Sequence, residues 1–166
     1  MVISCARRCG MLVGVGEHRY EVEVAWTGAT TDYRSYSRNH EVHTLGCKPI
    51  PASADPVIGR GDANRWNPEQ LLVAALSQCH MLWYLHLCTD AGIVVIDYRD
   101  AAVGIMSDAK FTNVTLHPRV VITSLDRADD AQALHVEAHK RCFIANSVNF
   151  PVAHEPRISA RRSAST

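Results

Sequence analysis

Hydrophobic and polar residues alternate over the stretch 19–26, RYEVEVAW, which places Tyr, Val, Val and Trp on one face. A period of two is typical of a half-buried strand, so we predict a strand here. A second extended stretch is expected over 33–44. The segment 47–66 is then rich in Pro, Gly, Ala, Ser and Asp, and its three prolines predict a long irregular loop. Loops of that length are often functional.

The sequence NPEQ, which begins at Asn67, has the features of a helix N-terminus. Asn67 can cap the helix, Pro68 suits the first turn because its missing N–H costs nothing there, and Gln70 can reach back to the cap. The residues that follow are apolar on nearly every side up to about Ala91, where a glycine ends the pattern. We therefore predict a long helix at the centre of the fold.

The second half of the chain continues with alternating segments. The stretches 93–106 and 110–123 predict an antiparallel pair of strands, and 126–141 predicts a helix with acids early and bases late. A last short strand is expected over 152–158. This order of elements predicts an α+β fold in which an antiparallel sheet covers one long buried helix.

Length and composition indicate one globular domain. The chain has 166 residues, of which 47% are hydrophobic and 20% charged. We expect the domain to occupy 17–158, with an N-terminal extension at 1–16 and a polar tail at 159–166. The 17 basic and 17 acidic residues cancel, which argues against a nucleic-acid-binding surface. We also expect no membrane-spanning segment, because no fully apolar run reaches about 20 residues.

Six cysteines raise the question of disulfides, metal binding or redox chemistry. They form no paired CxxC motifs, and some lie inside apolar helical segments, so we expect free thiols in a reducing compartment such as the cytoplasm. Cys79 and Cys88 are nine residues apart and face opposite sides of the central helix. His80 and His86 also face different ways, and we expect both to pack in the core rather than to share a site.

A metal-binding face is possible elsewhere in the sequence. His135, His139 and Cys142 are spaced i, i+4 and i+7 on the second predicted helix, which places them on one side. Three nitrogen and sulfur ligands would suit an open zinc site. A second interpretation makes these residues ordinary members of a helix surface.

Glu69 and the arginines before it allow two interpretations. A first-turn acid is stabilised by the helix dipole, and loop arginines such as Arg60 and Arg65 are commonly solvated. However, a guanidinium can also stabilise a cysteine thiolate, and an acid can fix that guanidinium by a bidentate pair. Cys79 by itself is either a small buried hydrophobic residue or a reactive thiol.

The segment NPEQLLVAALSQC places a helical cysteine ten positions after Glu69, and Cys142 follows the second predicted helix. With the element order and the length, this pattern resembles the OsmC/Ohr family of hydroperoxide-reducing proteins over about residues 17–158. The resemblance implies an OsmC-like fold, with an antiparallel sheet wrapped around the long buried central helix. It also implies an intertwined homodimer whose two active sites lie at the subunit interface.

The resemblance also assigns roles to individual residues. Cys79 matches the peroxidatic cysteine, whose thiolate attacks the O–O bond and becomes a sulfenic acid. Cys142 matches the resolving cysteine, which condenses with that sulfenic acid to a disulfide. Glu69 matches the acid that holds the active-site arginine. Arg60 matches that arginine as placed in the OsmC branch, and Arg38 is the alternative as placed in the Ohr branch.

The implied activity is thiol-dependent reduction of organic, and also inorganic, hydroperoxides in defence against oxidative stress. It needs no metal or organic cofactor, and its partner is an external thiol reductant such as a dihydrolipoyl-type dithiol. One departure is Phe143-Ile144 after Cys142, where the Ohr branch has a proline, which favours an OsmC-like or more divergent member. The alternative is a non-catalytic member of the same fold that binds a metal or small molecule or senses redox state.

Overall fold

The structure is a computed structural model and describes residues 16–160, so most of the predicted extension and tail lies outside it. Its elements in chain order are β1 (Glu23–Ala25), β2 (His40–His43), β3 (Ile50–Ala52), α1 (Pro68–Asp90), β4 (Val95–Asp100), β5 (Val103–Ser107), β6 (Lys110–Leu116), β7 (Pro118–Ile122), the 3-10 turn η1 (Leu125–Arg127), α2 (Ala128–Arg141), the 3-10 turn η2 (Ala145–Ser147), β8 (Val152–His154) and β9 (Arg157–Ala160).

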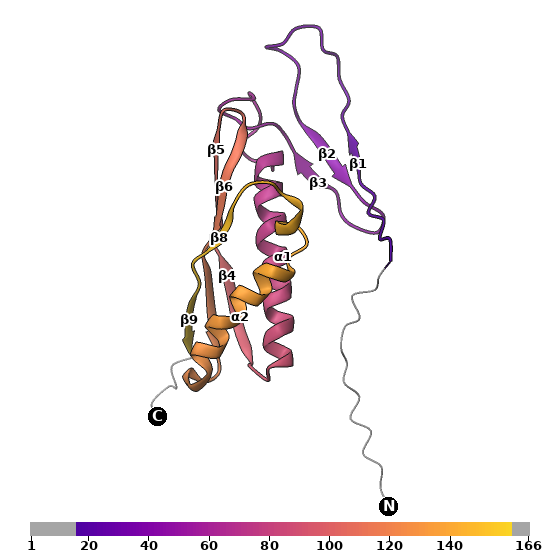
Figure 1. The fold of residues 1–166 in the computed structure, drawn as a ribbon. Helices are drawn as coiled ribbons and strands as arrows, with labels where there is room; N and C mark the ends of the chain where they lie inside the picture. Colours follow the sequence, from indigo (N-terminus) through magenta and orange to yellow (C-terminus); the bar gives the residue numbers. More distant parts are fainter. Residues whose placement is uncertain (1–15, 161–166) are drawn as a thin grey trace, which may run out of the picture.

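The predicted central helix is confirmed, together with its capping residues. Asn67 Oδ1 accepts a hydrogen bond from the Gln70 amide at 2.7 Å, and the Asn67 amide donates to Gln70 Oε1 at 3.2 Å. The length and apolar composition of α1 would allow it to span a membrane, but the core helices of globular proteins have the same two properties. Here α1 runs along the body of the molecule with strands on one side and α2 crossing it (Figure 1), so it is the core helix.

Each long strand predicted over 93–106 and 110–123 is divided into two. β4 pairs with β7 and β5 with β6, both antiparallel, so the two halves belong to different sheets. The Asp100 carboxylate lies at this division, where it accepts hydrogen bonds from the His117 amide at 2.7 Å and the Ser77 hydroxyl at 2.6 Å. The carboxylate thus accepts a hydrogen bond from an amide that would donate to a backbone carbonyl if the strand pairing were continuous.

The predicted α+β class is confirmed with one refinement in strand direction. The chain leaves β7, passes through α2 and returns as β8 and β9, which lie parallel to β6 and β7. A helical crossover permits this parallel arrangement. The last strand β9 continues to Ala160, so the first two residues of the expected polar tail pair with β7.

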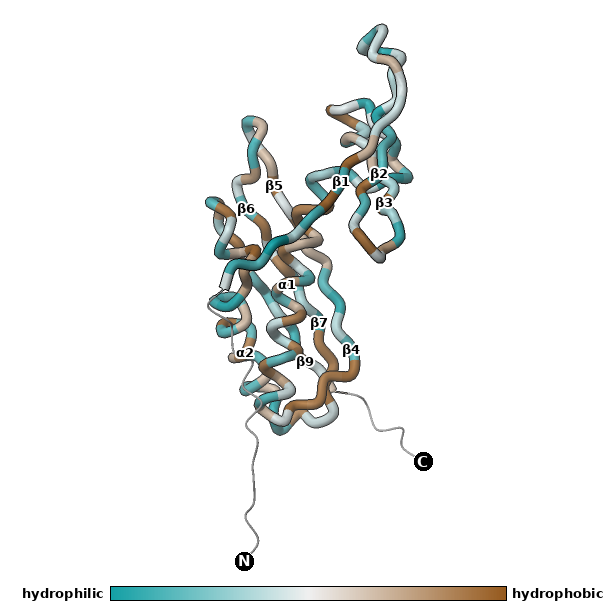
Figure 2. The backbone as a smooth tube through the Cα atoms, turned by 90° about the vertical axis from the view of Figure 1, so that its right-hand side faces the viewer, coloured by the Kyte–Doolittle hydropathy of each residue, from teal (hydrophilic) through white to brown (hydrophobic). Residues whose placement is uncertain are grey.

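The strands β1, β2 and β3 form a separate sheet, here called the N-terminal arm, which stands apart from the body (Figures 1 and 2). β3 lies in the predicted loop and contains Pro51, which an edge strand tolerates. The arm leaves large apolar side chains exposed, namely Tyr20, Val22, Val24, Tyr33 and Leu45. Within one chain, therefore, the arm buries little of its hydrophobic surface.

Candidate active site

A pair of cysteine thiols meets where α1 and α2 pack together. Cys79 is half-buried on α1, and Cys142 is fully buried at the residue that ends α2. The Cys79 thiol lies close enough to act on the pKa of Cys142, and the Ala145 amide donates to Cys142 Sγ at 3.4 Å. Both cysteines are free. The structure therefore brings together two of the predicted site residues that are far apart in the sequence.

Burial sets the protonation of Cys142. It raises the pKa of this thiol to about 11; the Ala145 amide acts in the opposite direction, and the neighbouring Cys79 adds to the increase. Cys142 is consequently a neutral thiol at neutral pH.

Aromatic side chains stand beside the thiol pair. Trp83 lies one turn after Cys79 on α1, and its ring meets Phe143 edge to face at 5.5 Å between centroids. The Arg141 guanidinium lies 5.9 Å from the centre of the Trp83 ring and pairs with Glu137 at 2.9 Å. The i, i+4 spacing of Arg141 from Glu137 predicts this ion pair.

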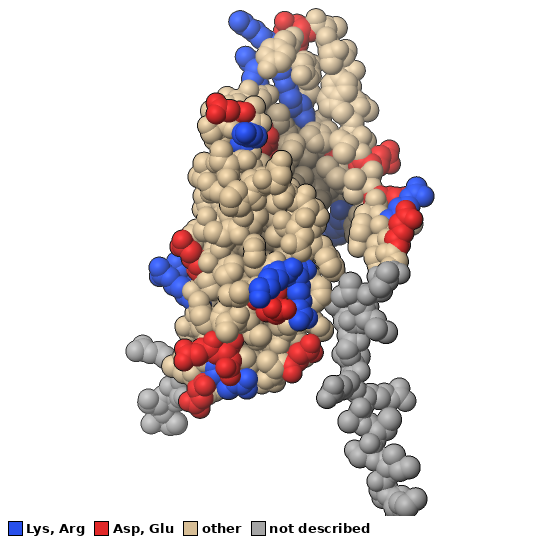
Figure 3. Space-filling view, viewed as in Figure 1, with Lys and Arg blue, Asp and Glu red and all other residues tan. Residues whose placement is uncertain are grey.

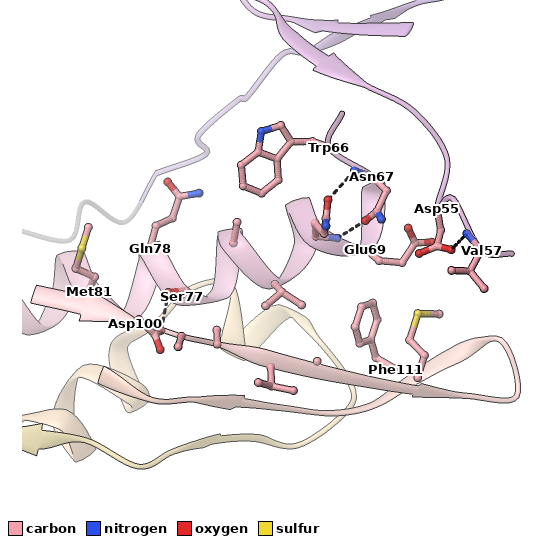
Figure 4. Close-up of a pocket in the computed structure, with 18 of the residues that line it drawn as sticks. Asp55, Val57, Trp66, Asn67, Glu69, Ser77, Gln78, Met81, Asp100 and Phe111 are labelled. Carbon is pink, nitrogen blue, oxygen red and sulfur yellow. Dashed lines mark hydrogen bonds between the residues drawn. The ribbon is translucent and has the colours of Figure 1, made fainter. Parts of the chain in front are cut away.

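Glu69 lines a different feature, a groove of about 1100 Å³ along α1 (Figure 4). Asp55 and Phe111 lie at one end of the groove and Met81 at the other, as Figure 4 shows. Much of its lining is apolar, with Val57, Ile58, Trp66, Val73, Ala74, Val103 and Met106. Glu69 Oε2 is buried and has no hydrogen-bond partner among the described residues. Within residues 16–160 no Lys or Arg lines the groove.

Neither predicted arginine reaches Glu69 within the described part of the chain. Arg60 is exposed in the loop and has a positive φ of 58°. Arg38 belongs to the arm, where its guanidinium donates to the carbonyls of Tyr33 and Tyr36 and lies 3.7 Å from the centre of the Tyr36 ring. The predicted pair of acid and arginine is not formed inside one chain and stays a prediction for an assembly of two.

The predicted metal-binding face does not form. Among residues 16–160 no group of three or more His, Cys, Asp or Glu side chains is arranged to hold a metal ion. Cys142 meets Cys79, whereas His135 hydrogen-bonds to His80 across the helix interface. His80 packs in the core as expected and shares no site with His86, but its hydrogen bond to His135 was not predicted. The sequence signal for this contact was a histidine on an apolar helix together with a second histidine on the other helix.

Comparison with known proteins identifies the family. The family model described as OsmC-like protein matches residues 61–156. An OsmC-like protein of unknown function from Vibrio cholerae is 34% identical, with a TM-score of 0.76 over 85% of this chain and 100% of that one. The chain belongs to the OsmC-like protein family.

Other solved structures share the OsmC-like fold at lower identity. An organic hydroperoxide resistance protein from Legionella pneumophila is 22% identical, with a TM-score of 0.58 over 86% of this chain and 99% of that one. The organic hydroperoxide resistance protein of Bacillus subtilis is 19% identical, with a TM-score of 0.55 over 84% and 98%. No curated protein shows significant sequence similarity to this OsmC-like protein.

Proposed function

We propose that this OsmC-like protein is a cysteine-based peroxidase that reduces organic hydroperoxides in defence against oxidative stress. The observation that carries the proposal is the proximity of Cys79 on α1 to Cys142 at the end of α2. Oxidation of one of two neighbouring thiols allows the pair to condense to a disulfide. Structural relatives named organic hydroperoxide resistance proteins support the same class of reaction.

The two cysteines have different roles in the reaction because their surroundings differ. Cys79 is the more accessible sulfur, and its thiolate attacks one oxygen of the hydroperoxide. The O–O bond breaks, the leaving alkoxide takes up a proton to become an alcohol, and Cys79 becomes a sulfenic acid. The Cys142 sulfur then attacks the Cys79 sulfur, the S–S bond forms and water leaves. An external dithiol reduces the disulfide and is itself oxidised.

The apolar wall of Trp83 and Phe143 favours an organic substrate. Their edge-to-face pair stands beside the thiols, and the Phe143 side chain is 54% exposed. A bulky hydrocarbon group can pack on such a surface, whereas hydrogen peroxide gains nothing from it. Organic hydroperoxides are therefore the preferred substrate class in this proposal.

The proposed working form is a homodimer in the cytoplasm. Two features of the single chain support this: an arm with exposed apolar side chains, and a groove containing an unpartnered Glu69 oxygen. A second copy would cover this surface and bring an arginine, Arg60 or Arg38, to Glu69. Free thiols fit a reducing compartment.

The test is hydroperoxide consumption by the full chain with dihydrolipoamide as reductant. Cys79→Ser should abolish consumption of cumene hydroperoxide. Cys142→Ser should perform one turnover with this peroxide and then hold a sulfenic acid that dimedone labels at Cys79. Cys47→Ser is the matched control, because Cys47 is an exposed cysteine and no part of the pair. Full activity of the Cys79→Ser variant would refute the proposal.

A further inference from the structure

A hydrogen-bonded pair of buried histidines, here called the histidine dyad, joins the two helices that carry the thiols. His80 lies on α1 and His135 on α2, and both side chains are withdrawn from solvent. His80 Nε2 and His135 Nδ1 are 2.9 Å apart, and the rings are inclined by only 8°. In this hydrogen bond one nitrogen must donate and the other must accept, so it cannot persist when both rings are protonated.

The titratable groups that face the dyad are other histidines and tyrosines. His139 on α2 and His154 on β8 complete the group of imidazoles, and Tyr84 of α1 stacks on His135 at 3.8 Å between centroids. Tyr98 of β4 packs against Tyr84, with 5.9 Å between the ring centroids. Among residues 16–160 no carboxylate or basic side chain other than histidine acts on the pKa of either dyad ring. An extra proton on the dyad would therefore lack a counter-charge.

Within residues 16–160, the outer nitrogens of the dyad have no polar neighbour that would stabilise an extra proton. His80 Nδ1 and His135 Nε2 are buried and have no hydrogen-bond partner among the described residues. Burial, followed by the neighbouring histidines, lowers the pKa of His80 to about 4 and that of His135 to about 3. Both rings are neutral at neutral pH and gain protons only in acid.

The dyad and the thiol pair both lie between the same two helices. Cys79 directly precedes His80 on α1, and Cys142 follows His135 by seven residues, about two helical turns along one side of α2. Because a packed helix moves as a rigid unit, a displacement of α2 at His135 also moves Cys142 relative to Cys79. The ring contact can therefore control the distance between the sulfurs.

We propose that His80 and His135 are positioning residues for the Cys79–Cys142 pair, and that protonation of their hydrogen-bonded rings moves α2 away from α1, so that disulfide closure is reversibly lost in acid. Protonation replaces an attraction between neutral rings with repulsion between buried charges. The use of this device to control peroxide reduction rests on the proposed function, whereas the positioning of the thiols does not.

The experiment closes the thiol pair chemically, without peroxide. Dipyridyl disulfide reacts with one thiol to give a mixed disulfide and one thiopyridone, and a second thiol nearby displaces the other thiopyridone. Two thiols thus lose two electrons and two protons, which the reagent takes up. Separated thiols instead each retain a pyridyl label. Mass spectrometry of the Cys79 and Cys142 peptides gives the ratio of closed to doubly labelled protein, and this ratio reports proximity more than reaction rate.

In the wild-type chain we expect closure at about pH 7 and mainly double labelling at about pH 2.5, below the pKa of both rings. The double variant His80→Gln/His135→Gln can keep an interhelical hydrogen bond but does not titrate, so it should close at both pH values. His80→Ala loses the contact and should lower the closed fraction about fivefold at about pH 7. His86→Gln is the matched control on the same helix, outside the dyad, and should behave as wild type.

An equal loss of closure in acid by the wild type and the double glutamine variant would overturn the proposal, and so would unchanged closure by a folded His80→Ala variant. If His80→Ala does not fold, the glutamine variant still decides. Failure of the proposed function gives a different pattern, because the thiols would then close with dipyridyl disulfide in a pH-dependent way although cumene hydroperoxide is not consumed.

Discussion

The Cys142 thiol, buried at the end of α2, lies beside the half-buried Cys79 thiol on α1. The two cysteines have different surroundings, because burial keeps Cys142 protonated while Cys79 keeps access to solvent. The packing of α1 on α2 brings them together, so the proposed chemistry depends on this packing.

Truncation of the aromatic wall should change substrate selectivity. We expect Phe143→Ala to raise KM for cumene hydroperoxide by about fivefold and to leave that for hydrogen peroxide nearly unchanged, because only the bulky substrate packs on the ring. Steady-state kinetics with both peroxides measure this difference. Val136→Ala, on an exposed part of α2, serves as control. Equal changes for the two substrates would show that Phe143 does not contact the organic group.

The partner of Glu69 can be identified by double-mutant cycles. If Arg60 pairs with Glu69 in the assembly, Glu69→Gln and Arg60→Ala should each lower kcat/KM, and the double variant should be little worse than either single one. The same cycle with Arg38→Ala should then be additive. If instead Arg38 is the partner, the two results exchange places. Additivity in both cycles would mean that neither arginine pairs with Glu69.

Acid should weaken the fold because of the histidine dyad. The pKa values of His80 and His135 lie below the ordinary value of 6.5, so the unfolded chain binds more protons in mild acid. The free energy of unfolding should be unaffected above about pH 6.5 and should fall below it by up to about 1.4 kcal/mol per pH unit for each histidine. Urea unfolding at several pH values measures this slope, which His80→Gln/His135→Gln should reduce and His86→Gln should not.

The cap of α1 should contribute measurably to stability. Asn67→Ala removes the acceptor for the Gln70 amide, and we expect it to lower the free energy of unfolding by about 1 kcal/mol. Asn67→Asp keeps the acceptor and should preserve most of that stability. Chemical denaturation compares the two variants, and an equal loss in both would indicate that the cap contributes through something other than this hydrogen bond.

Charge distribution agrees with the neutral composition. On the face shown in Figure 3, basic and acidic side chains are interspersed, and uncharged surface lies between them. Such a surface provides no extended track of positive charge for a polyanion. The surfaces best suited to bind a partner are instead apolar, namely the arm and the groove beside Glu69.

Local sequence signals predicted α1 well because its determinants are local. Asn67, Pro68 and Gln70 act within one turn, and the apolar character of the helix needs no information about its neighbours. The division of the long strands at Asp100 was not predicted, because it depends on a hydrogen bond from the amide of His117, which lies between β6 and β7. β3 was missed for a related reason, since only pairing with β2 makes a strand of a segment that contains proline.

The sequence by itself determined the central helix, the α+β class and the cysteines that resemble those of the OsmC/Ohr family. Only the tertiary structure decided that Cys142 meets Cys79 and that His135 meets His80 rather than joining Cys142 in a metal site. The spacing of residues along a helix fixes which side chains share a face. It does not fix which other element that face packs against, because that depends on how the whole chain buries its apolar surface.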